Sequence, residues 1–534
     1  MTAHRIGLAV SMLLLIVGCG PDRPTDPLAQ LTTRAERTRY EQTTGYGEVV
    51  RLMEHAATLS ERVHFTTFGT TVETRPLPLV VVGDTTDARP ESVVAAGRTR
   101  VWLQGAIHGG EVCGKEALLM LLRDLVAGEH QDWSSSLTLL IAPIYNADGA
   151  ERIGPDTRPY QLGPLAGVGE RANTQGLDLN RDHMKLESPE ARALSLAYQT
   201  YDPHVIVDLH TTNGTEHGYH LTYSPPLHPN THPELVALLR EEWLPTVTQT
   251  IKTTDGWDFY YYGNLPFREG GERAWRTFDH RARFNNNYAG LRNRIGILSE
   301  AYAYVSFQAR VAATLRFVEE VLHFAHDRAD QIARLVQRAD QTSVTGTTLV
   351  TRGRPARSAE PVEILLGQTE EVLNPYTRAP MRRRLDVVDP ERMFEYGTFE
   401  ASVGGTETAP DAYYIPGHLT AVIDLLAAHG VDGVTLDADT TLQAEEFIIT
   451  ESVVLDRPIE GHRERRLEGR WTASQHTVPA GTVVAPVSQP LGRLVFALLE
   501  PRSDDGVVNW NLLDDTVAAG TTYPILRVPS PPTS

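Results

Sequence analysis

Cysteine is scarce in this chain of 534 residues, which contains only Cys19 and Cys113. No disulfide can form within the chain if Cys19 carries a lipid, so an exported form must rely on a buried apolar core. The length allows such a core and predicts two or three domains. We interpret Cys113 as a small packing residue.

Basic residues are also in deficit, with 49 Lys and Arg against 68 Asp and Glu and a formal net charge of −19. Nucleic acids and anionic membrane surfaces are recognised through basic patches. The balance therefore argues against nucleic acid as a partner. The simplest role for the negative charge is solubility.

The N-terminus lacks an apolar run long enough to span a membrane. Arg5 precedes an apolar stretch over residues 6–17, which is shorter than a typical spanning helix but fits the apolar segment of a secretory signal. The sequence Ile16-Val17-Gly18-Cys19 resembles the bacterial lipobox, in which Cys19 would be lipidated and become the mature N-terminus. A plain signal peptide with an incidental cysteine is the alternative.

Lipidation at Cys19 would place the protein outside the cytoplasm, with the lipid anchor as its only membrane attachment. Gly20, not aspartate, follows the cysteine. By analogy with Gram-negative lipoproteins, this favours the outer membrane, facing the periplasm or the cell surface. We expect residues 1–19 to be a lipoprotein signal peptide and residues 20–35 to be a tether.

Strand-like and helix-like segments alternate over residues 36–335. This alternation predicts an α/β domain with a mixed, mostly parallel central sheet flanked by helices. The expected strands cover 77–82, 101–103, 137–144, 205–209 and 294–298, and long helices follow residue 111 and cover 306–325.

A polar stretch over residues 338–359 marks a boundary, and the texture of the sequence changes after it. We expect residues 360–534 to form a smaller C-terminal accessory module of α+β or β-rich type. It would contain a helix at 419–428 and strands at 362–366, 447–450, 482–486 and 494–499.

The stretch from residue 101 to 125 passes from a strand-like run to a helical pattern through His108-Gly109-Gly110-Glu111. Glycines allow a tight turn at such a junction, and ligand crevices lie at strand ends in open α/β sheets. A histidine and a glutamate two residues apart can both face one zinc ion, which usually takes a third protein ligand in catalytic sites. A chance surface pair beside a glycine turn remains the alternative for this motif alone.

Further motifs follow in a fixed order. Asn146-Ala147-Asp148-Gly149 comes after an apolar strand, Arg171 precedes Asp178-Leu179-Asn180-Arg181, Asp208-Leu209-His210 closes another strand, and Glu300 closes a later one. This ordered set, over roughly residues 100–302, resembles the zinc carboxypeptidase family, the relatives of carboxypeptidase A. The resemblance implies one zinc ion per chain, a peptide or peptide-like substrate with a free carboxylate, and cleavage of the last peptide bond.

The same resemblance implies the role of each residue. His108, Glu111 and His210 would bind zinc, with His217 and His220 as competitors for the third position. Glu300 would be the general base, and Arg171 would stabilise the oxyanion, with Arg152 and Arg158 as alternatives.

Asn180 and Arg181 would bind the substrate carboxylate. Asp208 is either a residue that orients a zinc ligand or a structural aspartate. Tyr288 is the nearest candidate for the substrate-covering tyrosine of the family, although it lies closer to Glu300 than the family spacing suggests. Asp182-His183 also departs from the asparagine and aromatic residue usual after the arginine, which leaves the substrate pocket open.

Two other functions compete with the metallocarboxypeptidase. The first is a related zinc amidohydrolase or deacylase acting on N-acyl amino acids or peptidoglycan stem peptides. The second is a non-catalytic binding lipoprotein that retains the zinc fold. The complete set of ligands, with Glu300 and Arg171, favours the enzymes.

Overall fold

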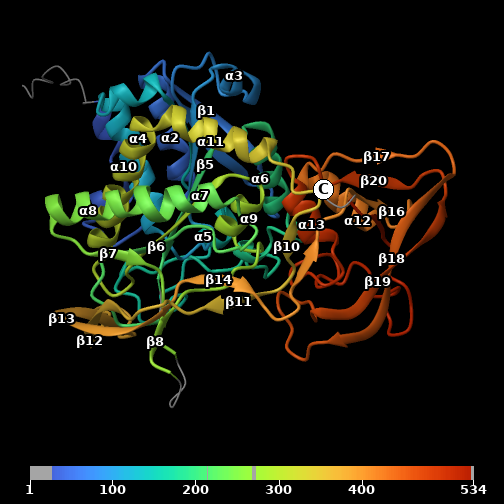
Figure 1. The fold of residues 1–534 in the computed structure, drawn as a ribbon. Coiled ribbons are helices and arrows are strands. Elements are labelled where there is room, and N and C mark those ends of the chain that lie inside the picture. Colours follow the sequence, from blue (N-terminus) through green and yellow to red (C-terminus); the bar gives the residue numbers. More distant parts are fainter. Residues whose placement is uncertain (1–26, 213, 267–271, 531–534) are drawn as a thin grey trace, which may run out of the picture.

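The computed structural model of the chain describes residues 27–212, 214–266 and 272–530. Its largest sheet has eight strands in the order β1-β2-β4-β3-β5-β9-β6-β7 (Figure 1). The central strands β4, β3, β5 and β9 are parallel, whereas β1 pairs antiparallel with β2, β2 with β4, and β6 with β9. In spatial order the strands are β1 (Val63–Thr70), β2 (Pro76–Val82), β4 (Leu137–Ala142), β3 (Thr99–Gly105), β5 (Val205–Thr211), β9 (Ile295–Ala301), β6 (Leu221–Ser224) and β7 (Phe259–Tyr261).

Both faces of this sheet are buried. In β5, Val205, Val207 and Leu209 join the apolar cluster on one face, and Ile206 joins the cluster on the other, as the two-residue period of a strand requires. The first face packs on α4 (Cys113–Ala127), α8 (Leu244–Asp255), α10 (Phe307–Asp327) and α11 (Ala329–Gln341), and the second on α2 (Tyr46–Leu59) and α6 (Pro189–Thr200). The predicted fold class, a mixed and mostly parallel sheet between helices, is confirmed.

Short helices precede the first strand or lie between the strands of the sheet. They are η1 (Pro27–Leu31), α1 (Arg34–Arg37), α3 (Pro90–Ala95), η2 (Gln131–Ser135), α5 (Ala147–Glu151), η3 (Leu179–Arg181), α7 (Pro233–Ala237), η4 (Leu238–Trp243) and α9 (Asn285–Leu291).

The C-terminal part is rich in strands. A long hairpin of β12 (Val362–Leu373) and β13 (Pro380–Tyr396) also pairs with β8 (Ala274–Arg276), and small two-stranded sheets join β10 (Thr348–Val350) to β15 (Thr406–Thr408) and β11 (Gly353–Ala356) to β14 (Thr398–Ala401). A six-stranded sheet contains β17 (Val434–Thr435), β20 (Val483–Pro486), β16 (Ala412–Ile415), β21 (Leu526–Val528), β18 (Thr440–Val454) and β19 (Arg465–Val478). Helices α12 (Thr420–His429) and α13 (Gly492–Leu499) accompany it.

One segment of this part differs from the prediction. Residues 494–499, expected to be a strand, belong to α13, in which every residue is buried. A short apolar run that is buried on all sides does not reveal its period, so pattern alone cannot separate a strand from a helix here.

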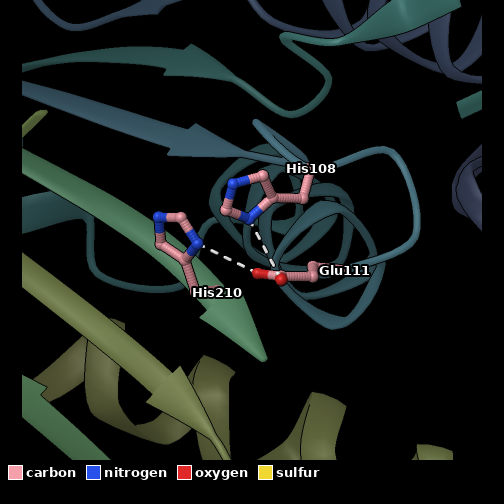
Figure 2. A group of neighbouring side chains, drawn as sticks. All are labelled: His108, Glu111 and His210. Carbon is pink, nitrogen blue, oxygen red and sulfur yellow. Dashed lines mark hydrogen bonds and ion pairs between the residues drawn. The ribbon is translucent and has the colours of Figure 1, made fainter. Parts of the chain in front are cut away.

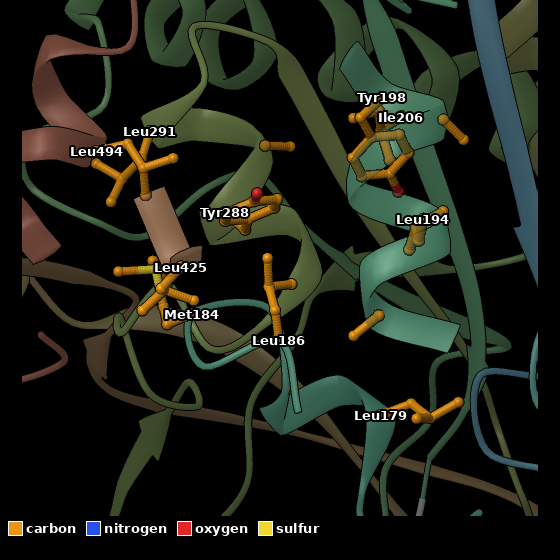
Figure 3. Close-up of a cluster of buried hydrophobic side chains, with 14 of the residues drawn as sticks. Leu179, Met184, Leu186, Leu194, Tyr198, Ile206, Tyr288, Leu291, Leu425 and Leu494 are labelled. Atoms are coloured by element: carbon orange, nitrogen blue, oxygen red, sulfur yellow. The ribbon is translucent and has the colours of Figure 1, made fainter. Parts of the chain in front are cut away.

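The C-terminal part shares its core with the large sheet. Leu425 of α12 and Leu494 of α13 belong to the same apolar cluster as Leu179, Met184 and Tyr288, and Figure 3 shows these side chains packed together. The two parts of the chain are therefore joined by buried apolar surface as well as by the backbone.

The described chain begins inside the predicted tether. Leu31 of η1 is buried in the main apolar cluster, so residues 27–35 pack on the domain and do not hang free. The predicted signal segment, with Cys19, lies outside the described residues. Among the residues that are described, no helix combines the length and apolarity needed to cross a bilayer.

Candidate metal centre and active site

The turn that carries His108 and Glu111 lies between the end of β3 and the start of α4. The Glu111 backbone nitrogen donates a hydrogen bond to the His108 oxygen at 2.9 Å, which closes the turn and sets both side chains on one side. A Cβ on Gly109 would lie 2.4 Å from the Ala150 nitrogen, and one on Gly110 would lie 2.7 Å from the Gly169 oxygen. The glycines are needed because neighbouring backbone packs directly against this turn.

Three side chains from two strand ends converge on one point (Figure 2). The Nδ1 atom of His108 lies 3.0 Å from Oε1 of Glu111, and Nδ1 of His210, at the end of β5, lies 2.9 Å from Oε2 of the same carboxylate. One ligand atom from each residue lies within 4.8 Å of the others, and all three residues are buried. His108 Nδ1 is buried and has no hydrogen-bond partner of good geometry among the described residues. A buried nitrogen without a partner, facing a carboxylate, is the arrangement that a zinc ion would complete.

The opposite nitrogen of each histidine faces an aspartate. Oδ1 of Asp178 forms a hydrogen bond of 3.0 Å with Nε2 of His108, and Oδ2 of Asp208 lies 3.0 Å from Nε2 of His210 as an ion pair without hydrogen-bond geometry. A carboxylate at that position orients the ring and makes the other nitrogen a better ligand. Asp208, two residues before His210 on the same face of β5, thus has the orienting contact proposed from the sequence. The corresponding role of Asp178 was missed, although Asp178 opens the motif that contains Arg181.

The electrostatics of this cluster favour a positive charge at its centre. Burial alone would raise the pKa of Glu111, but the charges of His108 and Arg158 and the close ring nitrogens of both histidines outweigh it and hold that pKa well below its usual range. Burial alone would lower the pKa of His210, but Asp208 and Glu111 outweigh it and raise that pKa well above its usual value. The residues present therefore suit a cation, whether a proton or a zinc ion.

Glu300 lies beside the ligands on the neighbouring strand. It is the register partner of His210 in the β5–β9 pair, and its buried Oε2 atom has no hydrogen-bond partner in the part of the chain that the structure describes. Burial raises the pKa of Glu300 to about 8, the Glu111 carboxylate adds to this effect, and the charges of His210 and Arg171 oppose it. A carboxylate with a raised pKa, in a cleft beside a group of candidate metal ligands, is a strong candidate for proton transfer.

The structure separates the competing arginines. Arg171 lines the cavity at the ligand cluster, with Nη1 3.6 Å from Glu111 Oε1 and Nη2 2.9 Å from Asp178 Oδ2. Arg158 does not line that cavity; its Nη1 holds Glu111 Oε1 at 2.6 Å, and its Nη2 donates to the Thr211 oxygen. Arg152 pairs with exposed glutamates away from the centre. Only Arg171 of the three can act on a ligand in this cavity.

The histidines that competed with His210 point elsewhere. The ring of His217 stacks on Tyr302 with centroids 4.0 Å apart, and Nε2 of His220 contacts Arg384 at 3.1 Å. Neither belongs to the group of candidate metal ligands.

Asn180 and Arg181 lie on η3 and line the same cavity. The Arg181 guanidinium stacks on the Phe284 ring at 3.9 Å from its centroid, and its Nη1 donates to the Asn180 carbonyl at 2.8 Å. Asp182, the next residue, accepts hydrogen bonds from Ser188 and Lys185 and is fully buried. The departure from the family pattern at this position is thus a structural contact and not part of the pocket.

The cavity has a volume of about 350 Å³. One part of its lining consists of the candidate metal, catalytic and carboxylate-binding residues: His108, Glu111, Arg171, Asn180, Arg181, His210 and Glu300. The rest of the lining consists of hydroxyl and apolar side chains: Thr211, Thr212, Tyr262, Phe278, Phe284 and Leu298. The cavity is therefore large enough for one amino-acid residue beside the metal ligands.

The prediction that Tyr288 contacts the substrate is wrong. Tyr288 is buried in α9, and its hydroxyl lies 2.8 Å from Nδ1 of His429 in the C-terminal part, so it is turned away from the cavity. Tyr262, which follows β7, lines the cavity instead. The signal that pointed to it was the aromatic run Phe259-Tyr260-Tyr261-Tyr262, which the sequence analysis did not use.

Comparisons with known proteins agree with this geometry. Residues 49–228 match the family model for zinc carboxypeptidases. Carboxypeptidase 2 of Trichophyton tonsurans is 24% identical over 456 residues, which cover 81% of this chain and 77% of that protein. Carboxypeptidase D of Homo sapiens is 33% identical over 114 residues, which cover 18% of this chain and 8% of that protein.

Among solved structures, a putative carboxypeptidase A from Shewanella denitrificans OS-217 shares 18% identity, covers 54% of this chain and 69% of its own, and has a TM-score of 0.40. This overlap is too partial to add to the topology described above. The family match and the His-Glu-His cluster confirm the predicted zinc metallocarboxypeptidase, a hydrolase of peptide bonds.

Proposed function

We propose, from the zinc carboxypeptidase match over residues 49–228, that this chain binds one zinc ion and removes the last residue of peptides with a free carboxylate. One observation carries the proposal: His108, Glu111 and His210 share a focus in the cavity that also holds Glu300, Arg171 and Arg181. A candidate metal site, proton-transfer group and carboxylate receptor would thus line one cavity.

The side chains divide the chemistry among them. A zinc ion held by the three ligands would supply Lewis-acid chemistry and lower the pKa of a nearby water. Glu300 would take a proton from the attacking water and return it to the leaving amine. Arg171 would stabilise the negative charge that develops on the carbonyl oxygen.

Arg181, with Asn180, would bind the terminal carboxylate of the substrate. A guanidinium matches a carboxylate in shape and charge. The stacking of Arg181 on Phe284 limits its conformations, and both residues line the cavity. Binding at this point would set the last peptide bond beside the ligand cluster.

The cavity wall supports a preference for apolar or aromatic terminal residues. Tyr262, Phe278, Phe284 and Leu298 form much of it, and the only carboxylates among the lining residues are Glu111 and Glu300. A lysine or arginine side chain would find no carboxylate to pair with except those of the reaction centre itself.

Product masses from a peptide panel test both proposals. The purified zinc protein is incubated with peptides that differ only in their last residue, with the same peptides amidated, and with N-acyl amino acids. We expect loss of one C-terminal residue, fastest for Phe, Tyr and Leu. Cleavage of N-acyl amino acids alone would support the amidohydrolase, and faster release of Lys or Arg would contradict the side-chain preference.

We also propose that the protein is exported and anchored by a lipid on Cys19, with the outer membrane as its destination. The support is the sequence around residues 5–20. Labelling cells with a fatty acid, with Cys19→Ala as control, tests the anchor. Label that persists in the Cys19→Ala variant would contradict it.

A further inference from the structure

The loop that joins β18 to β19 reaches from the C-terminal part to the back of the metal centre. Ile459 and His462 face each other across a two-residue turn, with backbone hydrogen bonds of 2.8 and 2.9 Å. The two turn residues, Glu460 and Gly461, have φ values of 49° and 83°. Positive φ at both positions is typical of a tight hairpin turn, but it is unfavourable for a residue with a Cβ. Glu460 is thus held in a conformation in which glycine or asparagine would be easier to place.

The Glu460 side chain binds the backbone of Asp178, whose carboxylate contacts the candidate zinc ligand His108. Its Oε2 atom accepts a hydrogen bond of 2.8 Å from the backbone nitrogen of Asp178, although 282 residues separate them. Asp178 is the residue that joins two catalytic groups: Oδ1 contacts His108 Nε2 at 3.0 Å, and Oδ2 accepts from Arg171 Nε at 3.0 Å. A shift of the Asp178 backbone would therefore move the carboxylate that contacts both His108 and Arg171.

Two further residues, His462 and Glu464, fix the same loop against segments next to the cavity. His462 Nε2 lies 2.7 Å from Oε1 of Glu187, at the end of the stretch that begins with Asp178. Glu464, which is buried, pairs with Arg281 at 3.0 Å and with Arg283 at 2.5 Å, just before Phe284. The loop therefore supports both the stretch that carries Arg181 and the ring on which Arg181 stacks.

We propose that Glu460 is a positioning residue of the metal centre, and that the 459–464 turn makes the C-terminal part a structural component of the active site. The carboxylate fixes the Asp178 backbone, Asp178 fixes the His108 ring, and the ring presents Nδ1 to the zinc ion. The inference rests on the zinc site of the proposed function. It assigns to the C-terminal part a role in metal retention.

Zinc affinity, measured by competition with a chromophoric chelator, tests the role without reference to catalysis. Three variants are compared with the unmodified protein. Glu460→Ala removes the acceptor; Glu460→Gln keeps an acceptor oxygen and removes the charge; Asp456→Ala removes an exposed acid of the same loop that, among the described residues, has no hydrogen bond or ion pair. The Tm of the zinc-free form of each variant reports whether the fold is intact.

Loss of a residue that orients a ligand typically costs 10–100-fold in metal affinity. Because Glu460 acts through Asp178, we expect about a tenfold weaker zinc affinity for Glu460→Ala, at the lower end of that range. Glu460→Gln should stay within about threefold of the unmodified protein, and Asp456→Ala should not differ from it.

Each result decides a different point. Equal zinc affinity for Glu460→Ala and the unmodified protein would overturn the inference, and so would a Glu460→Gln variant as weak as Glu460→Ala. An unmodified protein that does not bind zinc would instead refute the proposed function.

Discussion

The Arg181→Ala substitution tests the feature that distinguishes a carboxypeptidase from other zinc hydrolases. Arg181 stacks on Phe284, donates one hydrogen bond to the Asn180 carbonyl, and lies 3.9 Å from Asp178. Since an arginine fork has more donors than these contacts use, it retains N–H groups for a carboxylate in the cavity. Removing the Arg181 side chain should lower kcat/KM for substrates with a free C-terminal carboxylate and leave kcat/KM for substrates without one nearly unchanged.

The expected size follows from the exposure of the side chain. A hydrogen bond to a charged group contributes about 1.5–3 kcal/mol. The Arg181 side chain is 25% exposed, so solvent screening lowers the contribution, and we take about 2 kcal/mol. This corresponds to a loss of about 30-fold in kcat/KM for a peptide with a free carboxylate. For the same peptide amidated, kcat/KM should change by less than about threefold, because its neutral end cannot form the charged pair.

The assay is a cycle of two enzymes and two substrates, with release of the last residue as readout. Arg276→Ala is the matched control, because Arg276 also stacks on an aromatic ring, 3.7 Å from the centroid of Tyr396, but lies outside the cavity lining. It should leave both rates unchanged. Equal losses on the free and amidated peptides with Arg181→Ala would refute the carboxylate role.

Three further predictions follow from the buried polar groups. Asp208→Asn should weaken zinc affinity by about 10–100-fold in equilibrium dialysis, because it removes the carboxylate 3.0 Å from His210 Nε2; unchanged affinity would show that the ring needs no such partner. Tyr288→Phe should lower the free energy of unfolding in urea by about 1 kcal/mol, through its lost hydrogen bond to His429, and keep kcat/KM within about twofold; a larger kinetic loss would mean that the ring reaches the substrate. Burial raises the pKa of Glu500 from 4.5 to about 7, so the folded state binds the proton more tightly than the unfolded chain. The stability from this proton is complete below the unfolded pKa and is lost as the pH rises through 7, so Glu500→Gln should gain about 2–3 kcal/mol over the unmodified protein between pH 5 and pH 8; parallel stability profiles would contradict the shift.

The elements that form the metal centre could be predicted because their signals are local. The run at 205–209 is apolar, and it became β5 (Val205–Thr211) with His210 near its end. Ser188, Pro189 and Glu190 are residue types that favour a helix start, and at the start of α6 the Ser188 side chain accepts a hydrogen bond from the Ala191 nitrogen. Motifs at the ends of adjacent parallel strands lie at one edge of a sheet, and the resemblance to the zinc carboxypeptidases then implied which of these residues would share one zinc ion.

The residues that were missed depend on contacts between distant segments. Tyr288 was chosen by its closeness to Glu300 in sequence, but its direction is set by α9, which turns its ring toward His429. Glu460 gave no local signal, because its partner is the backbone nitrogen of Asp178 and any residue type offers the same group. Sequence pattern predicts which segments form strands and helices, but not which loop of one part will bind the backbone of another.

The apolar contact between α9 and helices α12 and α13 bears on which truncations and domain rearrangements this enzyme can tolerate during evolution. Leu291 packs beside Leu494 and Met184 beside Leu425, so a polypeptide cut after α11 would leave these side chains in water (Figure 3). We therefore expect the two parts to be inherited together, because separating them would expose the apolar surface that they share.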